Sequence, residues 1–133
     1  MIIDYNKQMK LIGNIIWLVF GGIEIAFEYL VASLVLMITI IGIPFGLQSL
    51  KLGMLALWPF GAKVATRRGQ PGCLSTVMNI LWFFVGGFWI CLSHLFLGVV
   101  FCLTVVGIPF GLQHFKLAHI ALTPFGREVI GVL

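Results

Sequence analysis

The chain has 133 residues, of which 61% are hydrophobic and 9% are charged, and its net charge is +4. Soluble domains contain about 45–50% apolar and about 25% charged residues, and a domain this small exposes much of its surface. The composition therefore argues against a soluble monomeric enzyme, and a disordered chain would need far lower hydrophobicity. Because the few basic residues flank apolar segments and form no nucleic-acid-binding motif, the expected partner is membrane lipid and not nucleic acid.

The chain begins with a polar segment, residues 1–10, that carries Lys7 and Lys10. The apolar stretch from Leu11 to Ile41 is too long for a signal peptide, whose apolar core has about 7–15 residues. The stretch is continuously apolar, which favours a helix over the alternating pattern of a barrel strand. Because one crossing needs about 20 residues, we expect either one long tilted helix or an interfacial helix followed by a span.

A turn and a shorter apolar stretch complete this unit, and the whole unit occurs twice. Residues 42–46 read Gly-Ile-Pro-Phe-Gly, residues 47–58 are again mainly apolar, and Pro-Phe-Gly closes the unit at 59–61. At an offset of 65 residues, small and polar residues recur in register, which indicates a tandem duplication. The matching positions include Asn14 and Asn79, Trp17 and Trp82, Gly21-Gly22 and Gly86-Gly87, Thr39 and Thr104, Gln48 and Gln113, and Lys51 and Lys116.

The duplication predicts an all-α membrane protein in which each repeat forms a helical hairpin. The second arm has about 18 residues, barely enough to cross, and Lys51 near its middle costs about 2.5–3.5 kcal/mol on insertion scales. This amphipathic arm is therefore expected to span, to re-enter or to lie in the interface. The predicted parts are an N-terminal segment (1–10), repeat 1 (11–61), a polar basic linker (62–76), repeat 2 (77–126) and a tail (127–133).

Basic residues at the N-terminus, in the linker and near the C-terminus favour two parallel hairpins, with the termini and the linker on the cytoplasmic side. Trp17 and Trp82 lie one turn before the glycine pairs and suit the headgroup level. Glycine and proline in the turns stop and restart a helix, either as hairpin tips or as broken helices that line a pore or substrate site. These helix-break residues are Gly42, Pro44, Gly46, Gly107, Pro109 and Gly111.

Two polar pairs recur in the second arms, where an ionisable residue marks a candidate functional site. Gln48 with Lys51, and Gln113 with Lys116, are three residues apart and share one helix face. The lysines either face a pore or substrate, where they would favour anions, or reach lipid headgroups by snorkelling.

Two carboxylates in the first arm break the repeat. Glu24 and Glu28 are four residues apart on one helix face, and their counterparts are Trp89 and Ser93. They would form a proton or cation site, pair with Lys51 inside the bundle, or lie near the interface. The sequence leaves these three interpretations open.

The remaining reactive residues fit no catalytic, metal or redox motif. Cys73, Cys91 and Cys102 form no CxxC pair, HExxH is absent, and the spacing of His114 and His119 does not put them on one helix face. We therefore expect no catalytic residue, no metal, no cofactor and no disulfide framework, and we expect that the protein is not an enzyme.

The order of these motifs is similar to that of the YccF family. The resemblance rests on the two Asn-x-x-Trp-x-x-x-Gly-Gly segments, the Gly-Ile-Pro-Phe-Gly turns with a downstream lysine, and the Pro-Phe-Gly closures, from about Asn14 to Val129. It implies a small multi-pass protein of the bacterial inner membrane and supplies no catalytic residues. Glu24 and Glu28 lie outside the family pattern, so any role for them would be particular to this sequence.

Two functions are compatible with the sequence. Because two short hairpins supply few helices, a pore would need several copies around an axis, so one expectation is a homo-oligomeric ion channel or small-solute transporter. The other is a non-transporting membrane scaffold or partner subunit whose amphipathic arms bind lipid headgroups. A monomer that tolerates loss of both second-arm lysines would favour the scaffold.

Overall fold

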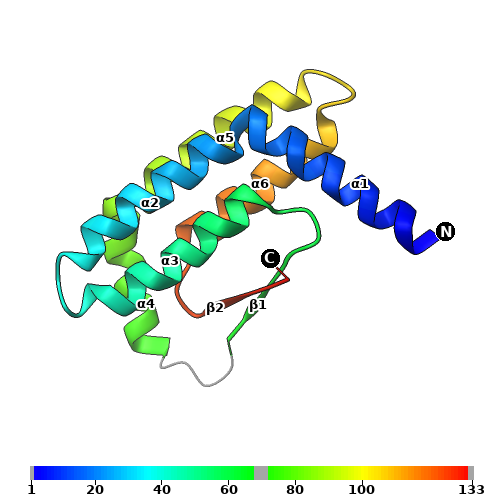
Figure 1. The fold of residues 1–133 in the computed structure, drawn as a ribbon. Helices are drawn as coiled ribbons and strands as arrows, with labels where there is room; N and C mark the ends of the chain where they lie inside the picture. Colours follow the sequence, from blue (N-terminus) through cyan, green and yellow to red (C-terminus); the bar gives the residue numbers. More distant parts are fainter. Residues whose placement is uncertain (1, 68–71, 132–133) are drawn as a thin grey trace.

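The computed structural model describes residues 2–67 and 72–131 (Figure 1). Its elements are α1 (Ile2–Trp17), η1 (Leu18–Gly22), α2 (Ile23–Met37), α3 (Gly42–Leu57), β1 (Lys63–Thr66), α4 (Gly72–Trp82), η2 (Phe83–Gly87), α5 (Phe88–Cys102), α6 (Ile108–Leu122) and β2 (Arg127–Ile130). The helical duplication that the sequence predicts is confirmed, because α2 packs along α3 and α5 packs along α6.

Each first arm is a long helix interrupted by a π-helical turn at its glycine pair. The two long helices, Asn6–Met37 and Gly72–Cys102, are apolar and long enough to cross a membrane. In η1 the backbone leaves the helical region at Phe20 and Gly21, and Gly21 has φ 148°, a conformation that favours glycine. The glycine pair thus bends the first arm, as kinks at glycine commonly do.

The segments that follow the two closures pair with each other as an antiparallel ribbon, β1–β2 (Figure 1). The strand β1 lies in the predicted linker and β2 lies in the predicted tail, where no strand is expected from the sequence. In this ribbon Val64 lies directly opposite Val129, and these two residues are 65 positions apart. This one pair of equivalent residues lies at the centre of the ribbon, as expected where a two-fold axis passes between the repeats.

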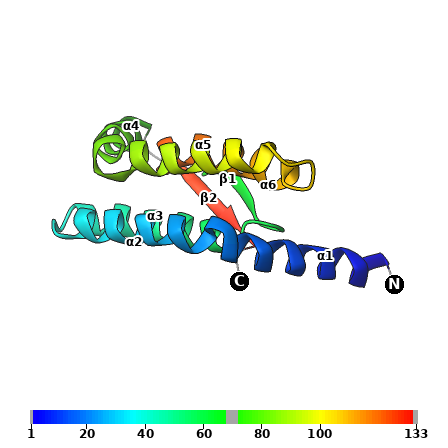
Figure 2. The same ribbon diagram turned by 90° about the horizontal axis from the view of Figure 1, so that it is seen from above.

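The same axis relates the two first arms. A Cβ atom placed on Gly86 would lie 2.5 Å from the Ala32 Cβ, and one placed on Gly21 would lie 2.9 Å from the Leu97 Cδ1. The second half of α2 thus meets the glycine pair in the middle of the α4–α5 arm, and the second half of α5 meets the glycine pair of η1. The two hairpins are therefore antiparallel, with their tips at opposite ends of the molecule (Figures 1 and 2).

The prediction of two parallel hairpins is wrong in this respect. Charge distribution reports which segments share a side of the membrane, but it carries no information about how two equivalent helices pack. The packing is instead set by the small residues that let the two first arms approach closely. The ribbon still joins the two closures, since Arg67 donates its backbone N–H to the Gly126 oxygen at 2.8 Å.

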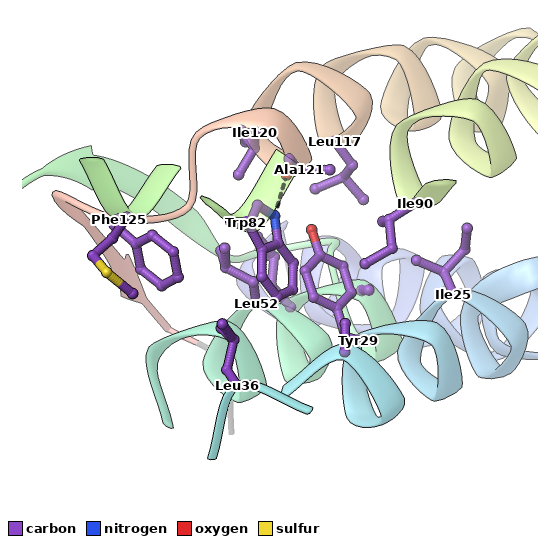
Figure 3. Close-up of a cluster of buried hydrophobic side chains, with 14 of the residues drawn as sticks. Ile25, Tyr29, Leu36, Leu52, Trp82, Ile90, Leu117, Ile120, Ala121 and Phe125 are labelled. Carbon is purple, nitrogen blue, oxygen red and sulfur yellow. Dashed lines mark hydrogen bonds between the residues drawn. The ribbon is translucent and has the colours of Figure 1, made fainter. Parts of the chain in front are cut away.

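The centre of the molecule is an aromatic and aliphatic cluster at the junction of the two repeats (Figure 3). Trp17 and Trp82 are 1% and 0% exposed, which overturns their predicted place at the headgroup level. Each indole Nε1–H donates to a backbone oxygen of the second arm, Trp17 to Ala56 at 2.7 Å and Trp82 to Ala121 at 2.8 Å. The tryptophans therefore tie the two arms of each hairpin together from within the core.

The asparagines that precede the tryptophans hold the closures. Asn14 Nδ2 donates to the Phe60 oxygen at 2.9 Å, and the Phe60 N–H donates to Asn14 Oδ1 at 2.8 Å. Asn79 makes the equivalent pair with Phe125 at 3.2 and 3.0 Å. One side-chain amide thus satisfies both backbone groups of the closure, which matters where water is scarce.

The Gly-Ile-Pro-Phe-Gly segments form the hairpin tips. Thr39 Oγ1 accepts the Gly42 N–H at 3.0 Å and donates to the Leu36 oxygen at 3.3 Å, and Thr104 repeats this arrangement with Gly107 and Phe101. Pro44 and Pro109 lie in the first turn of α3 and α6, where a missing N–H costs little. These bonds support the tip interpretation, because they satisfy the backbone without a ligand or a pore.

Candidate functional site

The predicted second-arm pair of repeat 1 lies beside the ribbon. Gln48 and the exposed Lys51, both on α3, line a pocket of about 200 Å³. Arg67, which directly follows β1, and Glu128 of β2 line it as well. We call this pocket, completed by Met54 and Val129, the basic pocket. It contains two cationic side chains and one carboxylate, and it therefore carries a net positive charge.

Gln48 fixes the position of β2 next to α3. Its Nε2 donates to the Arg127 backbone oxygen at 2.7 Å and lies 3.4 Å from the Pro124 oxygen. The Arg127 side chain turns toward the end of α6, where Nε donates to the Thr123 oxygen at 2.7 Å and Nη2 donates to Thr123 Oγ1 at 2.9 Å. A cation at a helix C-terminus is favourable, so Arg127 stabilises the fold rather than the pocket.

Repeat 2 carries its polar pair at the matching positions of α6. Gln113 is half-buried and Lys116 is exposed, as their counterparts are. On the ribbon, however, Lys63 stands at the position that corresponds to Glu128, since these residues are 65 positions apart. The two strands of the ribbon therefore carry opposite charges at this position, and the Glu128 carboxylate lies next to Lys51 in the basic pocket.

The predicted carboxylate pair of the first arm is divided by the structure. Glu24 is exposed, whereas Glu28 is half-buried and its Oε1 accepts the Ser93 hydroxyl at 2.6 Å. Ser93 is the repeat counterpart of Glu28, so this hydrogen bond lies on the two-fold axis. Of the three interpretations that the sequence left open, pairing of Glu28 with Lys51 is excluded, because Lys51 lines the basic pocket.

Each hairpin also contains a buried polar pair between its two arms, which the motifs in the sequence do not indicate. Ser33 and Ser49 hydrogen-bond between α2 and α3, and His94 Nδ1 lies 3.0 Å from His114 Nδ1 between α5 and α6. Ser49 and His114 occupy equivalent positions of the two repeats. A polar residue at the same place in both apolar arms is the sequence feature that could have indicated these buried pairs. Since one imidazole must accept and the other donate, at least one of these histidines is neutral.

The histidine pair is enclosed by aromatic rings. Both side chains are fully buried, and Trp17 stacks on His114 at a ring-centroid distance of 4.0 Å. Within the described residues neither Nε2 atom has a hydrogen-bond partner. Among those same residues, no three His, Cys, Asp or Glu side chains group as metal ligands would.

These features define a helical membrane protein built from two copies of one hairpin, with a charged ribbon on one side and apolar arms on the other. The inner membrane component domain of the YccF family matches residues 12–62 and 77–127. These two matches cover most of the chain, and the chain belongs to the YccF family.

The chain is similar to proteins of two bacteria. The inner membrane protein YccF of Escherichia coli (strain K12) is 34% identical over 132 residues, which cover 93% of this chain and 89% of that protein. The protein of the same name from Shigella flexneri matches equally well. No solved structure matches the chain significantly.

Proposed function

We propose that the protein is a non-transporting component of the inner membrane that binds the phosphate of anionic lipid headgroups in the basic pocket. The observation that carries the proposal is the convergence of Lys51 and Arg67 on one pocket beside the polar ribbon. Lysine and arginine are the side chains that bind phosphate, as a point charge and as a planar fork respectively. Because Glu128 offsets one of the two positive charges, the pocket suits a singly charged phosphodiester.

The distribution of apolar surface supports the same proposal. Most side chains that α2 and α5 expose are apolar, and they include Phe27, Leu34, Trp89 and Phe96. Figure 1 shows α3 and α6 between the α2–α5 pair and the ribbon. Such a molecule presents apolar helices to acyl chains on one side and a cationic pocket to headgroup phosphates on the other.

Lipid retention in native mass spectrometry tests the proposal. Purified protein is titrated with phosphatidylglycerol or with phosphatidylcholine, and bound lipids are counted. We expect preferential retention of phosphatidylglycerol, and Lys51→Gln should weaken it about fivefold, as about 1 kcal/mol per basic residue implies. Lys7→Gln removes the same charge from the exposed face of α1 and serves as the matched control. Equal retention of both lipids, or equal effects of the two variants, would contradict the proposal.

The same spectra address transport, the other function that the sequence allowed. Side chains fill the junction between the hairpins, where Tyr29 stacks on Trp82 at 5.9 Å and Phe60 meets Phe110 at 5.6 Å. A pore would therefore need several copies around an axis. A closed assembly of four or more subunits, with anion flux that falls when Lys51 and Lys116 are replaced by glutamine, would favour a channel over headgroup binding.

A further inference from the structure

A groove between α2 and α5 combines a carboxylate with aromatic side chains. It has a volume of about 320 Å³, and its lining includes Phe27, Glu28, Val31, Val35, Trp89 and Ile90. The helices α2 and α5 lie on the side of the molecule away from the ribbon (Figure 1), and the groove shares no lining residue with the basic pocket. Neither the family resemblance nor the proposed headgroup binding accounts for it.

The close approach of the two first arms positions the groove. At Gly86 the arms are so close that a Cβ atom would lie 2.5 Å from the Ala32 Cβ. Glu28 is one helical turn before Ala32, and Trp89 is about one turn after Gly86. Because the two arms run antiparallel, the carboxylate and the indole lie on the same side of this contact, each on a different arm. Both residues line the groove.

One oxygen of the Glu28 carboxylate is unsatisfied. Oε1 accepts the Ser93 hydroxyl at 2.6 Å, whereas Oε2 is buried and has no hydrogen-bond partner within residues 2–67 and 72–131. A carboxylate in an apolar environment is costly unless a donor or a cation compensates it. The groove therefore offers an uncompensated acceptor within an apolar and aromatic wall.

The surroundings of the groove restrict what could reach this acceptor. Phe27 and Trp89 are each 63% exposed, and Val31 and Val35 are about half exposed, so the groove opens among apolar side chains. A hydrated metal ion would lose its water shell there, whereas an organic cation with apolar substituents partitions into such surroundings. Aromatic rings also attract such cations through their π-faces, by about 2 kcal/mol when the site is desolvated.

We propose that this groove binds a lipophilic organic cation of the quaternary ammonium or phosphonium class, with Glu28 as its counter-ion. Phe27 and Trp89 supply aromatic contact, and Ser93 is a positioning residue that holds the carboxylate. The site occurs once per chain, because the repeat counterpart of Glu28 is Ser93 and that of Trp89 is Glu24. The carboxylate and the indole thus meet only where the two different repeats face each other.

Binding of tetraphenylphosphonium to the purified full chain in phosphatidylcholine nanodiscs tests the proposal. Equilibrium dialysis measures its affinity, and tetraphenylborate, which has the same shape and the opposite charge, is the ligand control. We expect saturable binding of one cation per chain and no saturable binding of the anion. Glu28→Gln should weaken cation binding at least about tenfold, because it removes the counter-ion. Ser93→Ala should weaken it less, by about threefold, because it removes one orienting hydrogen bond and leaves the charge in place.

The matched control is Glu24→Gln, which removes an exposed carboxylate one turn away on the same helix. It should leave the affinity within about twofold, because an exposed charge is well screened. Trp89→Leu should weaken cation binding without changing the charge of the groove, which separates aromatic contact from electrostatics. Equal affinity of wild type and Glu28→Gln, saturable binding of tetraphenylborate, or an equal loss in Glu24→Gln would each overturn the proposal.

Discussion

The two asparagines that hold the closures allow a quantitative test of the fold. Asn14→Leu removes both hydrogen bonds to the Phe60 backbone and leaves a backbone N–H and a C=O without partners. A hydrogen bond contributes about 0.5–1.5 kcal/mol net, and Asn14 is 1% exposed, so no solvent can replace the bonds. We therefore expect the free energy of unfolding to fall by about 2–3 kcal/mol.

The duplicated chain supplies the internal comparison. Asn79→Leu removes the equivalent pair, but Asn79 is only half-buried and its bonds are longer, at 3.2 and 3.0 Å. The expected loss is smaller, about 1–2 kcal/mol, because part of the backbone can find another partner. Unfolding in mixed micelles with increasing dodecyl sulfate, followed by circular dichroism, measures both values, with the exposed substitution Ile15→Val as control.

The order of the two losses is the decisive result. If Asn79→Leu destabilises the protein more than Asn14→Leu, burial and bond length do not govern these closures, and the reasoning is refuted. Losses of unfolding free energy below about 0.5 kcal/mol in both variants would refute the reasoning as well. They would mean that the asparagine side chains find equally good hydrogen-bond partners in the unfolded state in micelles. Hydrogen exchange of the ribbon amides should also accelerate in each variant, because the closures lead directly into β1 and β2.

Three further predictions concern a glycine at a hairpin tip, the buried histidine pair and an exposed cysteine. Gly42→Ala should prevent correct folding or lower the free energy of unfolding by more than about 3 kcal/mol, because the new Cβ would overlap the Leu36 carbonyl oxygen. The control Gly72→Ala should be neutral in the same unfolding assay, because its new Cβ meets no atom within 4 Å. His94→Leu should destabilise the protein by about 1–3 kcal/mol, and His94→Leu with His114→Leu should cost less than the sum of the single variants, because the second change removes the unpaired imidazole. In a variant without the other cysteines, a membrane-impermeant maleimide should label Cys73 only after cells are opened, because the linker is expected on the cytoplasmic side. Labelling in intact spheroplasts would instead place the exposed thiol on the periplasmic side.

The helical hairpins and their duplication could be predicted from the sequence, because the glycine, proline and asparagine residues that shape them recur in register. Gly42 and Gly107 are examples, since each occupies a place at a tip where a Cβ would overlap a backbone oxygen. Such local steric requirements leave a mark at fixed spacing along the chain. The burial of Trp17 leaves no such mark in the sequence, because an indole suits both a membrane interface and a core. Only the structure shows that its N–H donates to the Ala56 oxygen inside the core.

Contacts between the repeats were beyond the reach of the sequence. Residues 63–66 and 127–130 form a ribbon only because each supplies the other's hydrogen bonds, and neither segment is long enough to be recognised as a strand alone. The same holds for the candidate sites. Lys51 was identifiable as an unusual residue in an apolar arm, but its neighbour Arg67 and the hydrogen bond of Glu28 to Ser93 depend on tertiary packing.

The two-fold axis that passes between Glu28 and Ser93 has a consequence for how such a protein can acquire a charged site. In a homodimer of single hairpins that assembled in this way, position 28 would face its own copy, and a glutamate there would meet a second glutamate within hydrogen-bonding distance. Two adjacent carboxylates cannot both remain ionised at such a distance. Joining the hairpins in one chain makes the pair a covalent heterodimer, so that a serine can supply the donor that one glutamate needs. Fusion of the two copies thus permits a charge on the axis that symmetry would forbid.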